Sequence, residues 1–370
     1  MILKELEIEN FRIFPYLSIS FSDGINIISG INGQGKTSIL ESIYYLALTK
    51  SFRTINDNNV ISYNKNYFNI VSTFISDSSG GNQIRLYHSL SEGKHLFVEK
   101  KEILKFSEYI GTIPSVILTL DDLKLTYGGP QERRKFLDIL ISQVSPVYLE
   151  DLKIYRRTIQ QKNALLGLDN KHTINKQIAV WNEKLIYHGS RIILHRLKFV
   201  KFLNEYLTNY YNIISASNDN ISVSYDCTID KETSPENEDR LRENFYRKVE
   251  QVFNKECERK RTLIGPHRDD LHFFKNGRLF KDFCSQGENK TLVIALKFLE
   301  WEYISSERSI KPIFLLDDIF GELDEIRMHG LLKYLEKIGQ AHITTTMQDK
   351  FKTHLPSKKF ILNNKKIIYD

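Results

Sequence analysis

Cysteine is scarce in this chain: only three of the 370 residues are cysteines, Cys227, Cys257 and Cys284, and they are far apart in the sequence. No C-x-x-C pair occurs, which argues against a disulfide framework and a zinc ribbon and predicts a reducing environment. No run reaches the roughly 18 uncharged apolar residues that a membrane helix needs. The opening segment MILKELEIENF contains acidic residues and no long apolar stretch. We therefore expect a cytoplasmic protein with no membrane partner.

A strong excess of charge is also missing. The chain has 52 Lys and Arg and 46 Asp and Glu, a net charge of +6, which alone does not predict a polyanionic partner. The charge is unevenly spread, because residues 151–214 contain eleven basic and four acidic residues (11 − 4 = +7). This segment is either a phosphate-facing surface or an ordinary solvated helix pair. A hydrophobic content of 41% is enough for a core, which excludes a disordered or fibrous chain.

The hydrophobic pattern predicts an α/β protein with a helical insertion. Apolar and polar residues alternate near the start and again over residues 67–98, as in half-buried strands. Helical spacing with few glycines or prolines extends from about residue 131 to 214, after which strand–helix alternation returns. A chain of 370 residues fits two domains of roughly 150 residues, or one large domain with an insertion. We predict a head formed by residues 1–115 and 255–370, and a helical arm with a flanking loop and strand at residues 116–254.

A glycine-rich phosphate loop follows a predicted strand at residues 25–29 and opens a predicted helix. It matches G-x-x-x-x-G-K-[ST] and consists of Gly30, Ile31, Asn32, Gly33, Gln34, Gly35, Lys36 and Thr37. Its glycines let backbone N–H groups converge on phosphates, and the helix N-terminus adds partial positive charge. We expect Lys36 to reach the β- and γ-phosphate oxygens and Thr37 to bind Mg²⁺. The alternative, an ordinary glycine turn, does not account for the strand and helix on either side.

An acidic pair, Asp317 and Asp318, follows the apolar run at residues 313–316. Such a run predicts a buried strand that ends at the carboxyl edge of a sheet, where a nucleotide-bound metal lies. We expect Asp317 to be a Mg²⁺ ligand and Asp318 to polarise the attacking water. Alone, the pattern also fits a buried strand that ends in a solvated loop. The phosphate loop elsewhere in the chain favours the catalytic interpretation.

A third motif, Ser285-Gln286-Gly287-Glu288, opens a predicted helix. A serine at a helix N-terminus, beside a glycine that permits close approach, can receive a terminal phosphate. The same residues also fit a plain N-cap in which Ser285 and Glu288 form a capping box. We favour the phosphate role because this helix directly precedes the strand that carries Asp317.

The three motifs, in this order and spacing, resemble those of ABC/SMC-type ATPase heads, and other segments resemble the RecF family. Glu9-Asn10-Phe11-Arg12 is similar to the opening motif of that family, and Gly265-Pro266-His267-Arg268 to a later one. The resemblance spans nearly the whole chain and implies an ABC/SMC-like P-loop ATPase head with an inserted α-helical arm (lobe II). It also implies that ATP and Mg²⁺ are bound by the phosphate loop with Arg12, Ser285 and Gly287, and that the catalytic residues are Lys36, Asp317, Asp318 and Ser285.

The resemblance further implies ATP-gated DNA binding in recombinational repair, on duplexes and single-strand/duplex junctions. It implies action with RecO and RecR to load RecA at gapped DNA, and roles in replication and the SOS response. Basic side chains of the arm are the candidates for DNA contact: Lys153, Arg156, Arg157, Lys162, Arg191, Arg196 and Lys198.

The inventory of motifs predicts a dimer. The chain has one phosphate loop and one serine–glycine signature, and heads of this type use each against the complement of a partner. A symmetric homodimer that sandwiches two ATP molecules is then implied, with Ser285 and Asp324 acting across an isologous interface. ATP would act as the ligand that shifts monomer to dimer.

Departures from the family pattern predict slow hydrolysis. Glu288 stands where the signature usually has Gln, and residues 118–125 lack the Gln that related ATPases use to sense water and metal. Asp121 or Asp122 is the candidate substitute, and no histidine follows residues 344–346. We expect at most a weak, DNA-stimulated ATPase. The alternatives are a small-molecule kinase and an ATP-binding clamp with negligible turnover.

Overall fold

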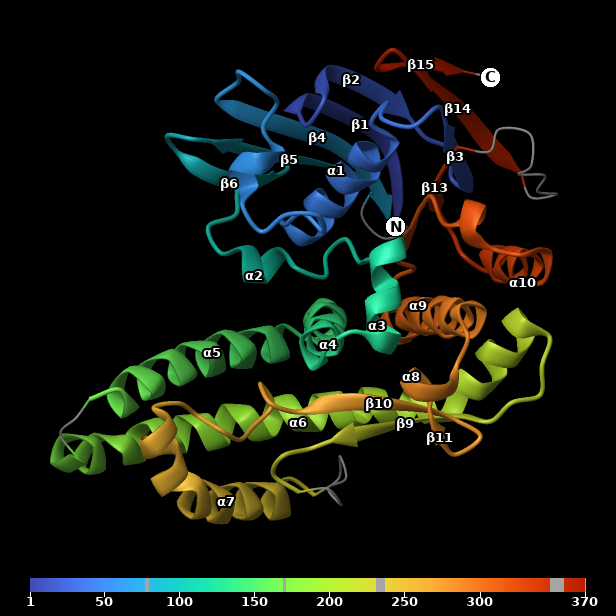
Figure 1. Cartoon of the computed structure of the whole chain (residues 1–370). Helices are drawn as coiled ribbons and strands as arrows, with labels where there is room; N and C mark the ends of the chain where they lie inside the picture. Colours follow the sequence, from blue (N-terminus) through green and yellow to red (C-terminus); the bar gives the residue numbers. More distant parts are fainter. Residues whose placement is uncertain (77–79, 169–170, 231–236, 347–355, 370) are drawn as a thin grey trace. The chain divides into compact units, whose positions relative to one another are not determined.

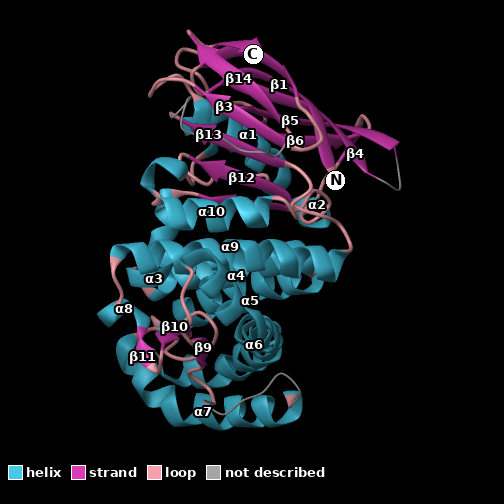
Figure 2. Cartoon of the chain, turned by 90° about the vertical axis from the view of Figure 1, so that its right-hand side faces the viewer, coloured by secondary structure: helices cyan, strands magenta, loops and turns pink. Residues whose placement is uncertain are grey.

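The chain divides into a head unit, assembled from three segments, and an arm unit, assembled from two. The computed structural model describes residues 1–76, 80–168, 171–230, 237–346 and 356–369 (Figure 1). The head unit comprises Met1–Leu123, Tyr210–Asn218 and Ser285–Asp370, and the arm unit comprises Lys124–Asn209 and Asp219–Cys284. Most strands belong to the head unit, whereas helices dominate the arm unit (Figure 2).

The first sheet of the head unit is antiparallel, with the strand order β2-β1-β4-β5-β6-β7. Along the first strand, Leu6 and Ile8 are fully buried while Glu5 and Glu7 are exposed, the alternation of a sheet with one face toward the core. The meander predicted for residues 67–98 is confirmed by the antiparallel pairing of β4, β5 and β6. The strands are β1 (Ile2–Phe11), β2 (Phe14–Ser20), β4 (Tyr67–Ser76), β5 (Gly80–Ser89), β6 (Gly93–Val98) and β7 (Lys101–Glu102).

The second sheet positions the candidate site. Its order is β15-β14-β3-β13-β12-β8, and all neighbours from β14 to β8 are parallel. Its central strands are buried along almost their whole length, as parallel strands covered on both faces must be. The carboxyl ends of β3 and β12 therefore open on the same edge, which brings the phosphate loop close to Asp317. The strands are β3 (Ile25–Ser29), β8 (Ser115–Leu118), β12 (Ile313–Asp317), β13 (Ala341–Thr345), β14 (Ser357–Asn363) and β15 (Lys366–Tyr369).

The helix that follows the phosphate loop, α1 (Lys36–Leu48), packs against strands of both sheets. Twelve of its 13 residues are buried, because a helix enclosed on two sides has no solvated face. The other helical segments of the head unit are η1 (Asp57–Val60), α2 (Phe106–Tyr109), η2 (Leu120–Leu123), α9 (Gln286–Arg308), η3 (Phe320–Glu322) and α10 (Glu325–Leu335).

The arm unit consists of helices and a small antiparallel sheet of order β11-β10-β9. Its longest helix has 45 residues, and proline occupies the first turn of two others, where no backbone N–H is lost from the helix. The helices are α3 (Lys124–Tyr127), α4 (Pro130–Val144), α5 (Pro146–Leu166), α6 (Lys171–Ser215), α7 (Glu238–Arg259) and α8 (Phe280–Phe283). The strands are β9 (Ile221–Asp226), β10 (Asp270–Lys275) and β11 (Arg278–Leu279).

The boundaries of the two units differ from the predicted ones. The head unit continues beyond residue 115, because β8 pairs with β12 in the parallel sheet. Residues 255–284, which we expected in the head, belong to the arm unit, because β10 pairs with β9. The chain therefore rejoins the head at Ser285, at the start of α9, apart from the short segment Tyr210–Asn218 at the end of α6.

Candidate nucleotide site

The phosphate loop is held by close packing around its glycines. Gly35 adopts a left-handed backbone (φ 100°), and a Cβ there would lie 2.7 Å from Ile13 Cδ1 and 2.8 Å from Phe14 Cζ. A Cβ on Gly30 would lie 2.6 Å from the carbonyl oxygen of Leu362. Any larger side chain at these two positions would displace the loop. The glycines of the motif therefore allow the loop to pack closely against the β1–β2 turn on one side and β14 on the other.

The N-terminus of α1 is open to an anion. Its N-cap residue is Gly35, no side chain caps it, and its first turn contains no acidic residue. The first backbone N–H groups of a helix lack intrahelical partners, and the helix dipole places partial positive charge there. These are the properties of a phosphate-binding helix N-terminus.

Lys36 lies inside the loop. Its side chain is buried, and its Nζ donates hydrogen bonds to the carbonyl oxygens of Gly30 (2.6 Å) and Ile31 (3.0 Å). Burial lowers the pKa of Lys36, while the nearby carboxylates of Asp318 and Asp317 act in the opposite direction. The ammonium group is thus held over the loop, beside the two acids predicted to act with it.

The two residues predicted to bind Mg²⁺ meet directly. Thr37 Oγ1 donates a hydrogen bond of 2.9 Å to Asp317 Oδ1, across 280 residues of sequence. Thr344 Oγ1 donates to the same oxygen at 2.8 Å, because Asp317 and Thr344 are paired in register on β12 and β13. Burial raises the pKa of Asp317, and the hydrogen bonds from Thr344 and Thr37 oppose this shift. A hydroxyl and a carboxylate are hard oxygen donors of the kind that Mg²⁺ prefers, so the residues present fit this ion.

Asp318 turns the chain at the edge of the sheet. It has a left-handed backbone (φ 50°), which Asp tolerates better than most residues. Its N–H donates to the carbonyl oxygen (3.2 Å) and the Oγ1 (3.0 Å) of Thr344. The turn is therefore fixed by the neighbouring strand, and the carboxylate of Asp318 interacts electrostatically with Lys36.

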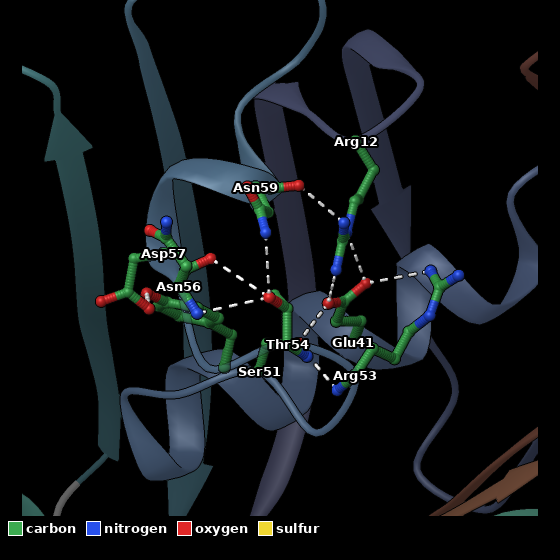
Figure 3. A network of polar contacts seen from close by, with 9 residues as sticks. Arg12, Glu41, Ser51, Arg53, Thr54, Asn56, Asp57 and Asn59 are labelled. Carbon is green, nitrogen blue, oxygen red and sulfur yellow. Dashed lines mark hydrogen bonds and ion pairs between the residues drawn. The ribbon is translucent and has the colours of Figure 1, made fainter.

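A buried carboxylate on α1 holds two arginines (Figure 3). Glu41 is completely buried, one turn after Thr37, and it accepts two hydrogen bonds from Arg12, from Nε (2.9 Å) and Nη2 (2.6 Å). Arg53 Nη1 donates to it at 3.3 Å, and Ser51 Oγ also donates. Arg53 is close enough to Asp317 to oppose, weakly, the rise in the pKa of that acid caused by burial. Arg12 was predicted at the site; Glu41 and Arg53 were not.

A signal for Glu41 exists in the sequence. After Lys36, it is the only charged residue in α1, a helix that otherwise contains apolar, aromatic and hydroxyl side chains. An acid in a helix buried all round needs a buried partner. That requirement predicts a cation, although not which one.

The signature residues form the capping box that we had weighed as the alternative. Ser285 Oγ accepts a hydrogen bond from the N–H of Glu288 (3.3 Å), and a carboxylate oxygen of Glu288 accepts from the N–H of Ser285 (2.7 Å). In the described part of the chain, the hydrogen bonds of Ser285 join it to Glu288 and Asn289, and none reaches the phosphate loop. Within one chain, Ser285 therefore serves as the N-cap of α9.

Asp122, a proposed substitute for the missing glutamine, is held by neighbouring residues of the head unit. The carboxylate of Asp122 accepts hydrogen bonds from the N–H (2.7 Å) and Oγ1 (3.0 Å) of Thr119, and it pairs with Lys297 at 3.0 Å. Asp121 is exposed. The residues after Thr346, where we noted the missing histidine, lie outside the described residues.

Two of the predicted DNA contacts are contradicted by the structure of the arm unit. Lys162 is completely buried and pairs with Glu256 at 2.7 Å. Arg196 is also buried and pairs with Asp138 at 2.8 Å, while its Nη1 donates to the carbonyl oxygen of Pro266 (2.7 Å). These two residues stabilise the arm and are wrong as DNA contacts. Arg191 is partly buried and pairs with Asp151, whereas the remaining four candidates are exposed: Lys153, Arg156, Arg157 and Lys198.

Comparison with known proteins agrees with this geometry. The chain matches the RecF/RecN/SMC N terminal domain family over residues 2–366. It is 39% identical over 355 residues to a "DNA replication and repair protein RecF" of Chloroherpeton thalassium, covering 95% of this chain and 96% of the relative. A relative of the same name from Bacillus mycoides is 36% identical over 349 residues, covering 94% and 92%.

Solved structures give the same result for the fold. A structure of "the recombination mediator protein RecF-ATP in RecFOR pathway" is similar with a TM-score of 0.90 and 28% identity, covering 100% of this chain and 97% of that one. An SMC head bound to the C-winged helix domain of ScpA has a TM-score of 0.58 at 15% identity and shares the fold alone, covering 100% and 97%. The predicted α/β head of ABC/SMC type is confirmed. Within the described residues, no helix has the length and apolar character needed to cross a membrane.

Proposed function

The chain belongs to the RecF/RecN/SMC N-terminal domain family and, within it, to the RecF proteins, and we propose that it is an ATP-gated DNA-binding protein of recombinational repair in the cytoplasm. The observation that carries the proposal is the hydrogen bond of 2.9 Å between Thr37 and Asp317, with Lys36 held over the same loop. Phosphate-binding, metal-binding and acidic groups meet there at one edge of a parallel sheet. The similarity to a solved RecF-ATP structure supports this nucleotide.

In the proposed site, each residue has one task. Lys36 transfers its hydrogen bonds from the carbonyl oxygens of Gly30 and Ile31 to phosphate oxygens, and the open N-terminus of α1 binds the phosphates. Thr37 and Asp317 hold Mg²⁺, which supplies neutralisation of phosphate charge when bound. Asp318 orients the attacking water. Turnover is slow, since no glutamine occurs in residues 118–125.

A second copy of the chain completes the site. Ser285 and Gly287 of one copy cap the triphosphate held by the phosphate loop of the other, and Asp324 acts across the same isologous interface. ATP then favours the dimer over the monomer, because it contacts both copies only in the dimer. The dimer acts with RecO and RecR to load RecA at gapped DNA, with roles in replication and the SOS response. The RecFOR pathway named for the solved relatives supports these partners.

DNA contact in this proposal falls to exposed basic residues of the arm unit. Lys153, Arg156, Arg157 and Lys198 are exposed, so they can reach phosphates of a duplex or a single-strand/duplex junction. Affinity for DNA should then fall steeply with salt and depend little on sequence.

The decisive experiment measures ATP turnover with and without gapped DNA, for the wild type and Asp317→Asn. The asparagine can still accept hydrogen bonds from Thr37 and Thr344, but it loses the charge that holds Mg²⁺. We expect weak turnover that DNA stimulates, and a loss of about 100-fold or more in the variant. Binding of ATP without any turnover would favour a clamp, and phosphorylation of a metabolite with no response to DNA would favour a kinase.

A further inference from the structure

A single arginine links the start of α9 to α10. We call the residues at that start, Ser285–Glu288, the signature turn. Arg327 lies in the first turn of α10, and its Nε donates hydrogen bonds of 2.8 Å to the carbonyl oxygen of Gly287 and to Thr291 Oγ1. Its Nη1 pairs with Asp324, the N-cap residue of α10. The side chain is 17% exposed. One guanidinium thus joins the first turn of α9 to the N-terminus of α10.

The same guanidinium explains the glycine at position 287. A Cβ on Gly287 would lie 2.8 Å from Nη2 and 2.9 Å from Cζ of Arg327, closer than real Cβ contacts. Arginine is flexible, but this one could withdraw only by giving up its hydrogen bonds to Gly287 and Thr291, and an unpaired charged donor is costly when partly buried. The small residue is therefore required by a contact within one chain, whatever its role toward a phosphate.

A second tie runs beside the first. Lys290 Nζ donates to the carbonyl oxygen of Glu322 and pairs with its carboxylate at 3.1 Å. Glu322 ends the short helix η3, which follows Asp317 and Asp318. Two cations at the start of α9 and α10 therefore link the signature turn to the segment that leads from the acidic pair to Asp324.

We propose that Arg327 is a positioning residue that fixes Ser285 and Gly287 in register with Asp324, so that a head presents all three to its partner as one rigid surface. The inference rests on the proposed function, because Ser285 and Asp324 act across the dimer only there. The Nε and Nη1 groups of Arg327 are engaged by Gly287, Thr291 and Asp324, so we assign it no contact with the nucleotide. It acts through the groups that it holds.

The first test is a double-mutant cycle on stability. In the wild type, Gly287→Ala forces Arg327 out and should lower the midpoint of thermal unfolding by about 2 °C or more. In the Arg327→Ala background the space is open, and the same change should raise the midpoint by about 2 °C, because alanine is the better helix former. The reversal of sign is the expected result. If Gly287→Ala changes the midpoint of thermal unfolding equally in the two backgrounds, the close contact between Gly287 and the Arg327 guanidinium does not exist.

The second test separates positioning from folding. Arg327→Ala should bind ATP as a monomer within about twofold of the wild type, because its phosphate loop is intact, while ATP-dependent association measured by sedimentation weakens by about tenfold. Arg327→Lys should not restore it, since lysine lacks the planar fork. Lys333→Ala, which removes an exposed cation from the same helix, is the matched control and should associate normally.

Mixed dimers give a readout that a folding defect would not. An equimolar mixture of Arg327→Ala and Lys36→Ala heads should turn over ATP faster than either variant alone, because the mixed dimer contains one composite site with an intact phosphate loop and an intact Ser285–Gly287 segment. If the wild type associates and Arg327→Ala associates equally well, the positioning role is wrong and the proposed function stands. If the wild type itself does not associate with ATP, the proposed dimer fails and the positioning role fails with it.

Discussion

The N-termini of α1 and α9 were both expected to meet phosphate, but they are built in opposite ways. α1 begins at a left-handed glycine, with no capping side chain and no acid in its first turn. α9 begins at Ser285 with both halves of a capping box formed, and the carboxylate of Glu288 lies at its N-terminus. The first helix end has no capping group in the way of an anion, whereas the second already has a negative group in place.

From this difference we expect the two helix ends to have different functions. The phosphate loop before α1 can bind a nucleotide within one chain. The end of α9 can receive a phosphate only if that interaction exceeds the capping bonds and the repulsion from Glu288. In the proposed function, we therefore expect α1 to supply most of the affinity for ATP and α9 to supply the selectivity for the dimer. A switch needs this division, because a ligand shifts an equilibrium only by its differential affinity for the two states.

The largest effect is expected from the α1 side. Lys36→Ala removes a charged donor from the phosphates and should weaken ATP binding by about 100-fold, or about 3 kcal/mol. ATP-dependent dimerisation should disappear with it. Binding is measured with a fluorescent ATP analogue and association by sedimentation.

Lys50→Ala, which removes an exposed lysine just beyond the other end of α1, is the control and should behave like the wild type. An unchanged monomer–dimer balance in Lys36→Ala would contradict the switch.

Glu41 tests whether α1 also organises the cations around its loop. Glu41→Gln leaves Arg12 and Arg53 beside a neutral buried group, so the free energy of unfolding should fall by about 2 kcal/mol in urea titrations. Arg12 and Arg53 then lose their fixed position, so KM for ATP should rise as well. Glu108→Gln removes an exposed acid and should cost less than about 0.5 kcal/mol. A destabilised variant with normal KM would show that the arginines serve the fold alone.

Local motifs could be predicted from the sequence, and tertiary pairings could not. The phosphate loop and the acidic pair follow from short patterns next to apolar strands, and parallel register then brings Thr37 and Asp317 together. Arg327 and Arg53 have no such pattern. Their roles depend on which carbonyl or carboxylate the fold places beside them, and no spacing rule along the chain encodes that.

The errors in the arm unit had a readable signal. Lys162 follows Tyr155 and Thr158 at helical spacing on the buried face of α5, and Arg196 lies between buried residues at 192–193 and 199–200. A cation on an apolar helix face is a candidate for a buried ion pair, not for a DNA contact. The predicted return of the chain to the head at residue 255 was wrong for another reason. The pairing of β9 with β10 bridges 44 residues and leaves no local mark in the sequence.

A third prediction concerns the body of α9, where Glu300 is buried beside Lys297 (3.1 Å). Burial raises the pKa of Glu300 to about 7. An acid whose folded pKa exceeds its unfolded value opposes folding when ionised, and the opposition disappears as pH falls through the folded pKa. Glu300→Gln should therefore be more stable than the wild type by about 1 kcal/mol at pH 8.5 and equal to it near pH 4.5, as measured by unfolding in urea. A difference that does not change with pH would show that Glu300 is not the titrating group.

The smallest effect should come from the charge at the N-terminus of α9, and it should have opposite signs in two measurements. Glu288→Gln keeps an acceptor for the N–H of Ser285, because glutamine also completes a capping box. It removes a negative charge that favours the helix, so the free energy of unfolding should fall by about 0.5 kcal/mol. The carboxylate of Glu288 also repels the phosphate that is bound to the partner copy, and the change removes this repulsion. ATP-dependent association should therefore tighten by about threefold. This gain should shrink at high salt, where the repulsion is screened.

Glu336→Gln, beyond the far end of α10, removes an equal charge and should leave association unchanged. Weaker association in Glu288→Gln would mean that the carboxylate itself contacts the partner, and the phosphate would then have to be received elsewhere.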